Sequence, residues 1–233
     1  QLDCVSCDPW LQEVGPAQGG TDPEVVIALG PAFGVQIIET LAGLDHRAVL
    51  PALIEGIQEE GVRARVIKVH HTSDCASIGH AGARLSGSGV AIGIQSKGTA
   101  VIHQKDRLPH NNLELFSNAP VTMIDHYEAM GFNATVYAAG ELPDPVVVPT
   151  RGEALGARFH ARVALTYAIE TAMTANNASP EEVFLAHQAG VVATQAPIQL
   201  RYTGQLIDLV AQGGSQDLTH ADQIDVEGEM ALC

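Results

Sequence analysis

The segment Glu24 to Gly30, EVVIALG, most limits what this chain can fold into. It is a continuous apolar run after Glu24, with the β-branched residues Val25 to Ile27 in succession, and it ends at Gly30-Pro31. A run without polar alternation is typical of a strand that is buried on both faces, and such strands occur in sheets that helices cover on both sides. The segment therefore predicts an α/β fold.

The segments after this strand alternate between helical and strand patterns. Apolar residues recur at the helical period from Asp45 to Glu60, and Gly61 follows as a stop signal. A strand is expected in RARVIKVHH, a helix that opens on Ser73 and Asp74, and strands in GVAIGIQ and TAVIHQ. This order predicts a Rossmann-like, mostly parallel sheet flanked by helices.

The second half of the chain is predicted to be mainly helical. We expect helical character from Asn111 to Gly140, a Pro-rich bridge ELPDPVVVPT, and a helix from about Gly152 to Ala175. The sequence SPEE at 179–182 has the pattern of a capping box with Pro at the first helical position, so a further helix is expected there.

Three regions follow from these patterns. Residues 1–23 are expected to be an irregular lead-in, residues 24–185 a Rossmann-like domain with a helical C-terminal arm, and residues 186–233 an extension without an assigned role. The longest apolar runs fall short of the roughly 20 residues that cross a bilayer, so we expect no membrane partner. No signal peptide is visible, which favours the cytoplasm.

The charge of the chain limits its partners. Its 12 Lys and Arg residues against 27 Asp and Glu residues give a net charge of -15. Nucleic acid is not expected as a partner, because binding a phosphate backbone needs clustered cations. A single phosphate remains compatible, since one lysine and a few backbone N–H groups can hold it.

The glycines of RLSGSGVAIGIQSKGTAVIH, residues 84–103, raise the question of a phosphate-binding loop. The spacing of Gly87, Gly89 and Gly93 is one residue too long for a dinucleotide fingerprint, and Lys97 precedes Gly98 where a P-loop needs the reverse order. Two interpretations stay open. The glycines allow a ligand to approach a strand that ends at Lys97, or the strand packs tightly on its own helix and Lys97 is solvated.

No catalytic or metal pattern stands out. The chain has no G-x-S-x-G and no H-E-x-x-H, and Asp125-His126 fits a helical surface pair better than a general base. Cys4 and Cys7 form half of a zinc site without a second half, so an incidental pair is favoured. These absences predict a binding subunit without catalytic residues or a bound metal.

Four segments resemble a known family: EVVIALGPAFG, IEGIQEEGVRARVIKVHHTSD, LSGSGVAIGIQSKGTAVIHQ and NLELFSNAPVT. They are similar to the medium subunit of adenosylcobalamin-dependent diol and glycerol dehydratases, from about Glu24 to Ala138 and more loosely to about Val183. The resemblance implies large and small subunits as partners in a dimer of heterotrimers, and transient contact with a reactivating factor. It also implies that the chain covers the nucleotide-tail side of adenosylcobalamin at the interface with the large subunit, which does the radical chemistry.

The resemblance implies a set of residues around the cofactor. Asp74 and Lys97 match the positions that contact the amides and nucleotide loop, and the weaker matches are Gly87, Gly89, Ser96, Gly98, Asn112, Leu113 and Leu115. No D-x-H-x-x-G loop is present, so the cobalamin is expected to keep its own base as lower ligand. The alternatives are the small subunit of the reactivating factor and an unrelated nucleotide-binding domain. The substrate diol and encapsulation in a bacterial microcompartment stay open.

Overall fold

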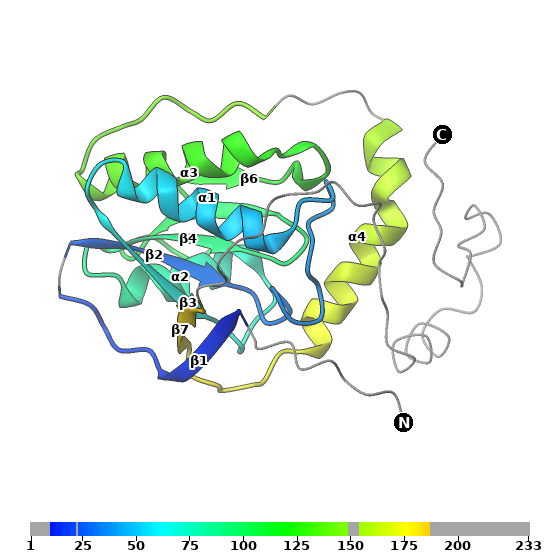
Figure 1. The fold of residues 1–233 in the computed structure, drawn as a ribbon, viewed down its shortest axis with the longest axis horizontal. Helices are drawn as coiled ribbons and strands as arrows, with labels where there is room; N and C mark the ends of the chain where they lie inside the picture. Colours follow the sequence, from blue (N-terminus) through cyan, green and yellow to red (C-terminus); the bar gives the residue numbers. More distant parts are fainter. Residues whose placement is uncertain (1–9, 22, 149–153, 187–233) are drawn as a thin grey trace. The chain divides into compact units, whose positions relative to one another are not determined.

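A computed structural model describes residues 10–21, 23–148 and 154–186, which all lie in one compact unit, Gln1–Gln188 (Figure 1). The strands are β1 (Leu11–Pro16), β2 (Glu24–Leu29), β3 (Arg63–Lys68), β4 (Val90–Ile94), β5 (Ala100–Gln104), β6 (Glu114–Phe116) and β7 (Glu181–Leu185). The helices are α1 (His46–Gln58), α2 (Cys75–Leu85), α3 (Ile124–Ala138) and α4 (Ala154–Ala172), with a 3-10 turn at Ala119–Val121. None of the described helices is long and apolar enough to cross a membrane.

The seven strands form one mixed sheet in the order β1-β7-β3-β2-β4-β5-β6. Helices flank it, so the predicted α/β class is confirmed. Only β3, β2 and β4 are parallel, and the pairs β1–β7, β7–β3, β4–β5 and β5–β6 are antiparallel. The expectation of a mostly parallel sheet is therefore wrong. The turn from β4 to β5 is too short for the crossover that a parallel neighbour needs.

Strand β2 is the centre of the core, as its apolar run predicted. All six of its residues are buried. Val25, Ile27 and Leu29 pack with residues of α1 and α3 on one face, whereas Val26 and Ala28 pack with residues of α2 on the other. The sheet thus has a two-helix layer on one side and α2 on the other.

The glycine of β4 has a packing role. A Cβ placed on Gly93 would lie 2.4 Å from the backbone nitrogen of Gly79 in α2. No side chain fits there, so α2 and β4 are in backbone contact. For Gly93 the tight-packing interpretation is the correct one.

Three local expectations were wrong. Residues 11–16 form β1 within the lead-in that was expected to be irregular, and residues 114–116 form β6 where helical character was expected. The predicted helix start at residues 179–182 is instead the beginning of β7, which pairs with β1 and β3. In each case a partner strand far along the sequence fixes the backbone, and local patterns do not show such a partner.

Candidate functional site

Asp74 lies at the carboxyl end of the parallel strands, where α2 begins. Its Oδ2 accepts a hydrogen bond from the backbone N–H of Ser77 at 2.8 Å, which makes it the cap of α2. The side chain is 45% exposed, and the Nδ1 of His110 lies 4.0 Å from the same oxygen. The segment between β5 and β6 therefore reaches Asp74, and Asp74 keeps acceptor capacity for a ligand.

Lys97 lies in the tight turn between β4 and β5, which is also at the carboxyl end of the parallel strands. Its ammonium is 5.5 Å from the ring centroid of Tyr167, which comes from α4. Among the residues that the structure describes, no carboxylate lies within 4.0 Å of this ammonium. The charge is thus positioned by an aromatic ring and remains available to an anion.

Cys75 connects Asp74 with the turn that contains Lys97. Its buried thiol contacts the carbonyl oxygens of Gly93 at 3.6 Å and Thr99 at 3.3 Å. Burial raises the pKa of this thiol to about 12, with smaller opposite effects from the charges of Asp74 and Lys97. Cys75 directly follows Asp74, and Thr99 lies two residues after Lys97, so this contact places the start of α2 next to the turn that contains Lys97. The thiol itself stays protonated and is a packing group.

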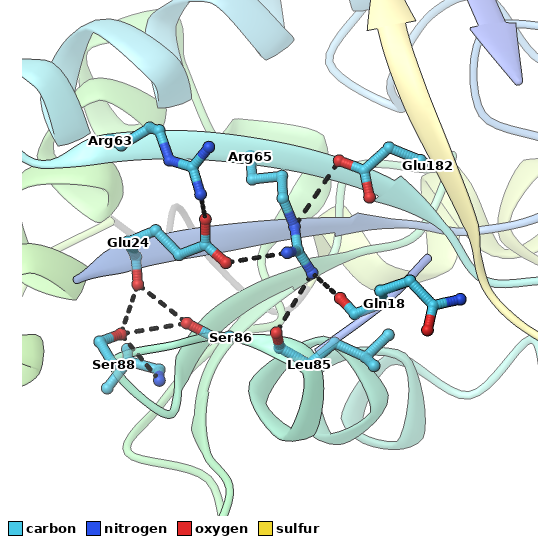
Figure 2. Close-up of polar contacts among 9 residues, drawn as sticks. Gln18, Glu24, Arg63, Arg65, Leu85, Ser86, Ser88 and Glu182 are labelled. Atoms are coloured by element: carbon cyan, nitrogen blue, oxygen red, sulfur yellow. Dashed lines mark hydrogen bonds and ion pairs between the residues drawn. The ribbon is translucent and has the colours of Figure 1, made fainter. Parts of the chain in front are cut away.

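Gly87 and Gly89 lie at the opposite end of the parallel strands, just before β4 begins. They precede β4, in a segment where the hydroxyls of Ser86 and Ser88 donate to the carbonyl of Glu24 at the start of β2 (Figure 2). The five residues of β4 separate this segment from Lys97, a length of about 16 Å. The structure therefore does not bring Gly87 and Gly89 together with Asp74 and Lys97.

The cluster around Glu24 has a structural role. Glu24 is fully buried and forms ion pairs with Arg63 and, at 3.0 Å, with Arg65 (Figure 2). Arg65 also donates to the carbonyl oxygens of Gln18 at 2.9 Å and Leu85 at 3.1 Å. This network fixes the starts of β2 and β3 to the end of α2, and a buried carboxylate of this kind needs such partners.

Ser96 and Gly98 shape the turn and face the interior. Gly98 has a φ of +98°, and its carbonyl accepts a hydrogen bond from the hydroxyl of Tyr127 at 2.8 Å. A Cβ on Gly98 would lie 2.7 Å from that hydroxyl, so the residue must be glycine. Ser96 is fully buried. Both residues therefore shape the turn that holds Lys97.

The three residues before and in β6 differ in their surroundings. The Oδ1 of Asn112 is buried without a hydrogen-bond donor in the described part of the chain. Leu113 packs against the main core and its N–H donates to the carbonyl of Ile102 at 2.9 Å. Leu115 is 57% exposed on the edge strand. Asn112 offers an unused acceptor, Leu115 an apolar surface, and Leu113 a core contact.

The buried carboxylate of Glu170 lies between the loops that follow β2 and β4, and the sequence analysis did not single it out. Glu170 of α4 is 2% exposed and accepts hydrogen bonds from the backbone N–H groups of Ala32 at 3.2 Å and Ser96 at 2.9 Å. Burial raises the pKa of Glu170. These two donors follow β2 and β4. The chain passes from β2 to β3 on one side and then to β4 on the other side of β2, so the order of the strands reverses between β2 and β4. This is the point where open α/β sheets bind ligands.

His46 connects the same two loops through hydrogen bonds of its ring. Its Nδ1 accepts from the N–H of Gly34 at 3.0 Å, and its Nε2 donates to the carbonyl of Ser96 at 2.8 Å. The ring stacks on Phe33, with centroids 3.7 Å apart. Burial lowers the pKa of His46 to about 3, so the imidazole is neutral and acts as a fixed connector between the two loops.

Helix α4 lies across the end of the sheet toward which β2 points (Figure 1). Its Thr171 hydroxyl is 2.9 Å from the hydroxyl of Ser73, and its Arg162 is 3.8 Å from Glu39. Together with Tyr167 and Glu170, these contacts fix α4 against the loops after β2, β3 and β4. The sequence predicted a helix from about Gly152 to Ala175, but it gave no signal for the position of this helix on the sheet.

The family model of the dehydratase medium subunit matches residues 30–144. This part of the chain belongs to the dehydratase medium subunit family. Asp74, Lys97 and Asn112 lie inside the matched range, whereas α4 lies outside it. The family assignment therefore covers the residues at the candidate site that the sequence resemblance had indicated.

Other comparisons give partial similarity. The DNA-directed RNA polymerase subunit beta' of Koribacter versatilis (strain Ellin345) is 38% identical over 80 residues, which are 34% of this chain and 6% of that protein. A glycerol dehydratase reactivase structure aligns with 56% of this chain and 100% of its own, at 21% identity and a TM-score of 0.42. A diol dehydratase-reactivating factor complexed with ADP and Mg²⁺ aligns with 54% and 98%, at 19% identity and a TM-score of 0.41. These TM-scores are too low to assign a function.

Proposed function

We propose that this chain is the medium subunit of an adenosylcobalamin-dependent diol or glycerol dehydratase. In this role it covers the nucleotide-tail side of a base-on cobalamin, and a large subunit supplies the substrate site and the radical chemistry. The observation that supports the proposal most is that residues 30–144 match the dehydratase medium subunit family, and that Asp74 in this range caps α2 where Cys75 contacts the turn that contains Lys97.

The chemistry of these side chains suits a cobalamin tail. A lysine ammonium pairs with a phosphodiester through a charge-assisted hydrogen bond, and Lys97 has no carboxylate within 4.0 Å among the described residues that would compete. Asp74 and the unused Oδ1 of Asn112 are acceptors, and the amide side chains of a corrin ring are donors. The donor and acceptor types therefore match, with Lys97 for the phosphate and Asp74 for the amides.

Glu170 disfavours the alternative of a nucleotide-binding domain. Such a domain needs a phosphate at the backbone N–H groups that follow the central strands. In this chain the carboxylate of Glu170 already accepts from Ala32 and Ser96. A second anion at these donors would be repelled at short range in a region that excludes water.

Two reactive side chains near this edge, Cys75 and His46, are buried and held by hydrogen bonds. Cys75 is held as a thiol, and His46 is buried and neutral with both ring nitrogens in hydrogen bonds. In the proposed dimer of heterotrimers, this chain contributes cofactor binding and the partner subunits contribute the catalytic groups.

Co-expression tests this assignment. The chain should form a complex with a large and a small dehydratase subunit, and this complex should bind adenosylcobalamin. Lys97→Ala should weaken that binding about tenfold or more, because a hydrogen bond to a charged group contributes about 1.5–3 kcal/mol. Lys105→Ala is the matched control, since Lys105 packs on Gly89 at the other edge.

Two results would contradict the proposal. A complex whose cobalamin affinity is the same with Lys97→Ala and Lys105→Ala would remove the role of Lys97. Capture of an ATPase-like large subunit in place of dehydratase subunits would identify the chain as the small subunit of the reactivating factor, which needs the sheet but not the cofactor contacts.

A further inference from the structure

Glu13, His70 and Glu181 form a cluster of potential metal ligands on the flank of the sheet away from Lys97. One ligand atom from each side chain lies within 4.8 Å of those of the other two, and the Nε2 of His70 is 3.0 Å from the Oε2 of Glu13. In the described part of the chain, no other set of three His, Cys, Asp or Glu side chains is this close. The imidazole distinguishes this set from the acidic surface clusters expected in a chain of net charge -15.

The sheet fixes the three side chains independently of one another. Glu13 lies on β1 opposite Val183, and Glu181 lies on β7 opposite Lys68 of β3. His70 follows β3 two residues after Lys68. Because side chains alternate along a strand, this register puts Glu13, Glu181 and Lys68 on one face. Three separate segments thus converge through backbone pairing, which is the pre-organisation that a metal site requires.

The cluster contains a like-charge contact that a cation would relieve. A carboxylate oxygen of Glu13 and one of Glu181 lie within 4.8 Å of each other. Lys68 faces the other oxygen of Glu13, with its Nζ 3.8 Å from Oε1, and donates to the carbonyl of Phe33 at 2.9 Å. The ammonium is therefore held on the buried side, and the Oε2 of Glu13 points toward His70.

We propose that Glu13, His70 and Glu181 bind a divalent transition-metal ion, with Zn²⁺ the best match. One imidazole nitrogen and two carboxylate oxygens are a ligand set that Zn²⁺ accepts in tetrahedral geometry, with water in the fourth position. Among the ions that accept nitrogen and oxygen ligands, Zn²⁺ binds more tightly than Mn²⁺ or Fe²⁺. The ion would fasten the strand pair β1–β7 to the end of β3, and so connect residues 13 and 181 across the chain.

Metal stoichiometry tests the proposal in the full chain. Cys4 and Cys7 lie outside the described residues, so the titration uses a Cys4→Ser, Cys7→Ser background that removes their thiolates. After treatment with EDTA, this protein should bind Zn²⁺ and gain thermal stability from it. Glu13→Gln and Glu181→Gln should each abolish the binding of one equivalent of Zn²⁺ or lower its affinity. The loss of affinity should exceed the roughly 10–100-fold that follows removal of a residue that only hydrogen-bonds to a metal ligand.

Matched controls separate the site from general surface binding. His71→Asn changes the neighbouring exposed histidine, and Glu60→Gln removes an exposed carboxylate that precedes β3, at the other end of this strand from His70. Both should leave the stoichiometry unchanged. Equal Zn²⁺ stoichiometry and affinity in the background protein, Glu13→Gln and Glu181→Gln would overturn the proposal, as would the absence of any Zn²⁺ binding by the folded background protein.

Discussion

Replacing Glu170 by alanine tests whether α4 is fixed to the sheet by a buried carboxylate. In the wild-type chain this carboxylate accepts from the N–H groups of Ala32 and Ser96. Alanine leaves both donors without a partner, at about 1–3 kcal/mol for each unsatisfied group. Part of this loss is offset, because the wild-type chain must take a charge out of water. We expect the free energy of unfolding to fall by about 3 kcal/mol.

Urea unfolding followed by tryptophan fluorescence measures this loss. Trp10 is the single tryptophan of the chain, and it is a buried member of the main core cluster. Its fluorescence therefore reports on the unit that contains Glu170. The control is Glu55→Ala on the exposed face of α1, which should change the free energy by no more than about 0.5 kcal/mol. If Glu170→Ala lowered the free energy of unfolding as little as this control, Glu170 would not anchor α4.

The remaining predictions concern pH, packing and metal. His46 has a folded pKa of about 3 against an ordinary value of 6.5. The unfolded chain therefore binds the extra proton, and stability should fall as pH drops from 6.5 toward 3 by up to about 1.4 kcal/mol per pH unit. Urea titrations should show this slope in wild type and lose it in His46→Gln; equal slopes would contradict the buried neutral state. A Cβ on Gly56 would lie 1.9 Å from the carbonyl oxygen of Glu128, whereas one on Gly19 would meet nothing within 4 Å. Gly56→Ala should thus lower the melting temperature by the equivalent of about 1–3 kcal/mol or more, and Gly19→Ala should not; equal melting temperatures would refute the close approach of α1 and α3. Zn²⁺ should raise the melting temperature of the Cys4→Ser, Cys7→Ser protein but not that of its Glu13→Gln variant, and an equal rise in both would contradict the metal site.

The sequence predicted those elements whose pattern is local. The apolar run of β2, the helical period of α1 and the cap residue Asp74 of α2 each show in a few consecutive residues, and the structure has all three. Strands β1, β6 and β7 were missed because their pairing partners determine them. In β7, the two glutamates that resemble a helix start lie opposite Lys68 and Ile67 of β3, and Glu181 is 113 positions after Lys68 along the chain.

The sequence predicted only part of the candidate site, and the parts that it missed depend on contacts between residues far apart in the chain. Asp74 and Lys97 came from the family resemblance, and the structure places both at the carboxyl ends of the parallel strands. Gly87 and Gly89 were grouped with Lys97 because they are close in sequence, although β4 carries the chain across the sheet between them. Glu170 and Tyr167 were missed because their contacts, Ala32 and Lys97, lie 138 and 70 positions away, and no periodicity in α4 indicates which face meets the sheet.

A comparison of two corrinoids tests the central claim most directly. In the assembled complex, binding of adenosylcobalamin and of a corrinoid that lacks the nucleotide tail and its phosphate is measured with wild type and Lys97→Ala. If Lys97 pairs with the phosphodiester, Lys97→Ala should weaken cobalamin binding about tenfold or more and leave binding of the tailless corrinoid unchanged. Equal weakening of both corrinoids, or of neither, would contradict the account.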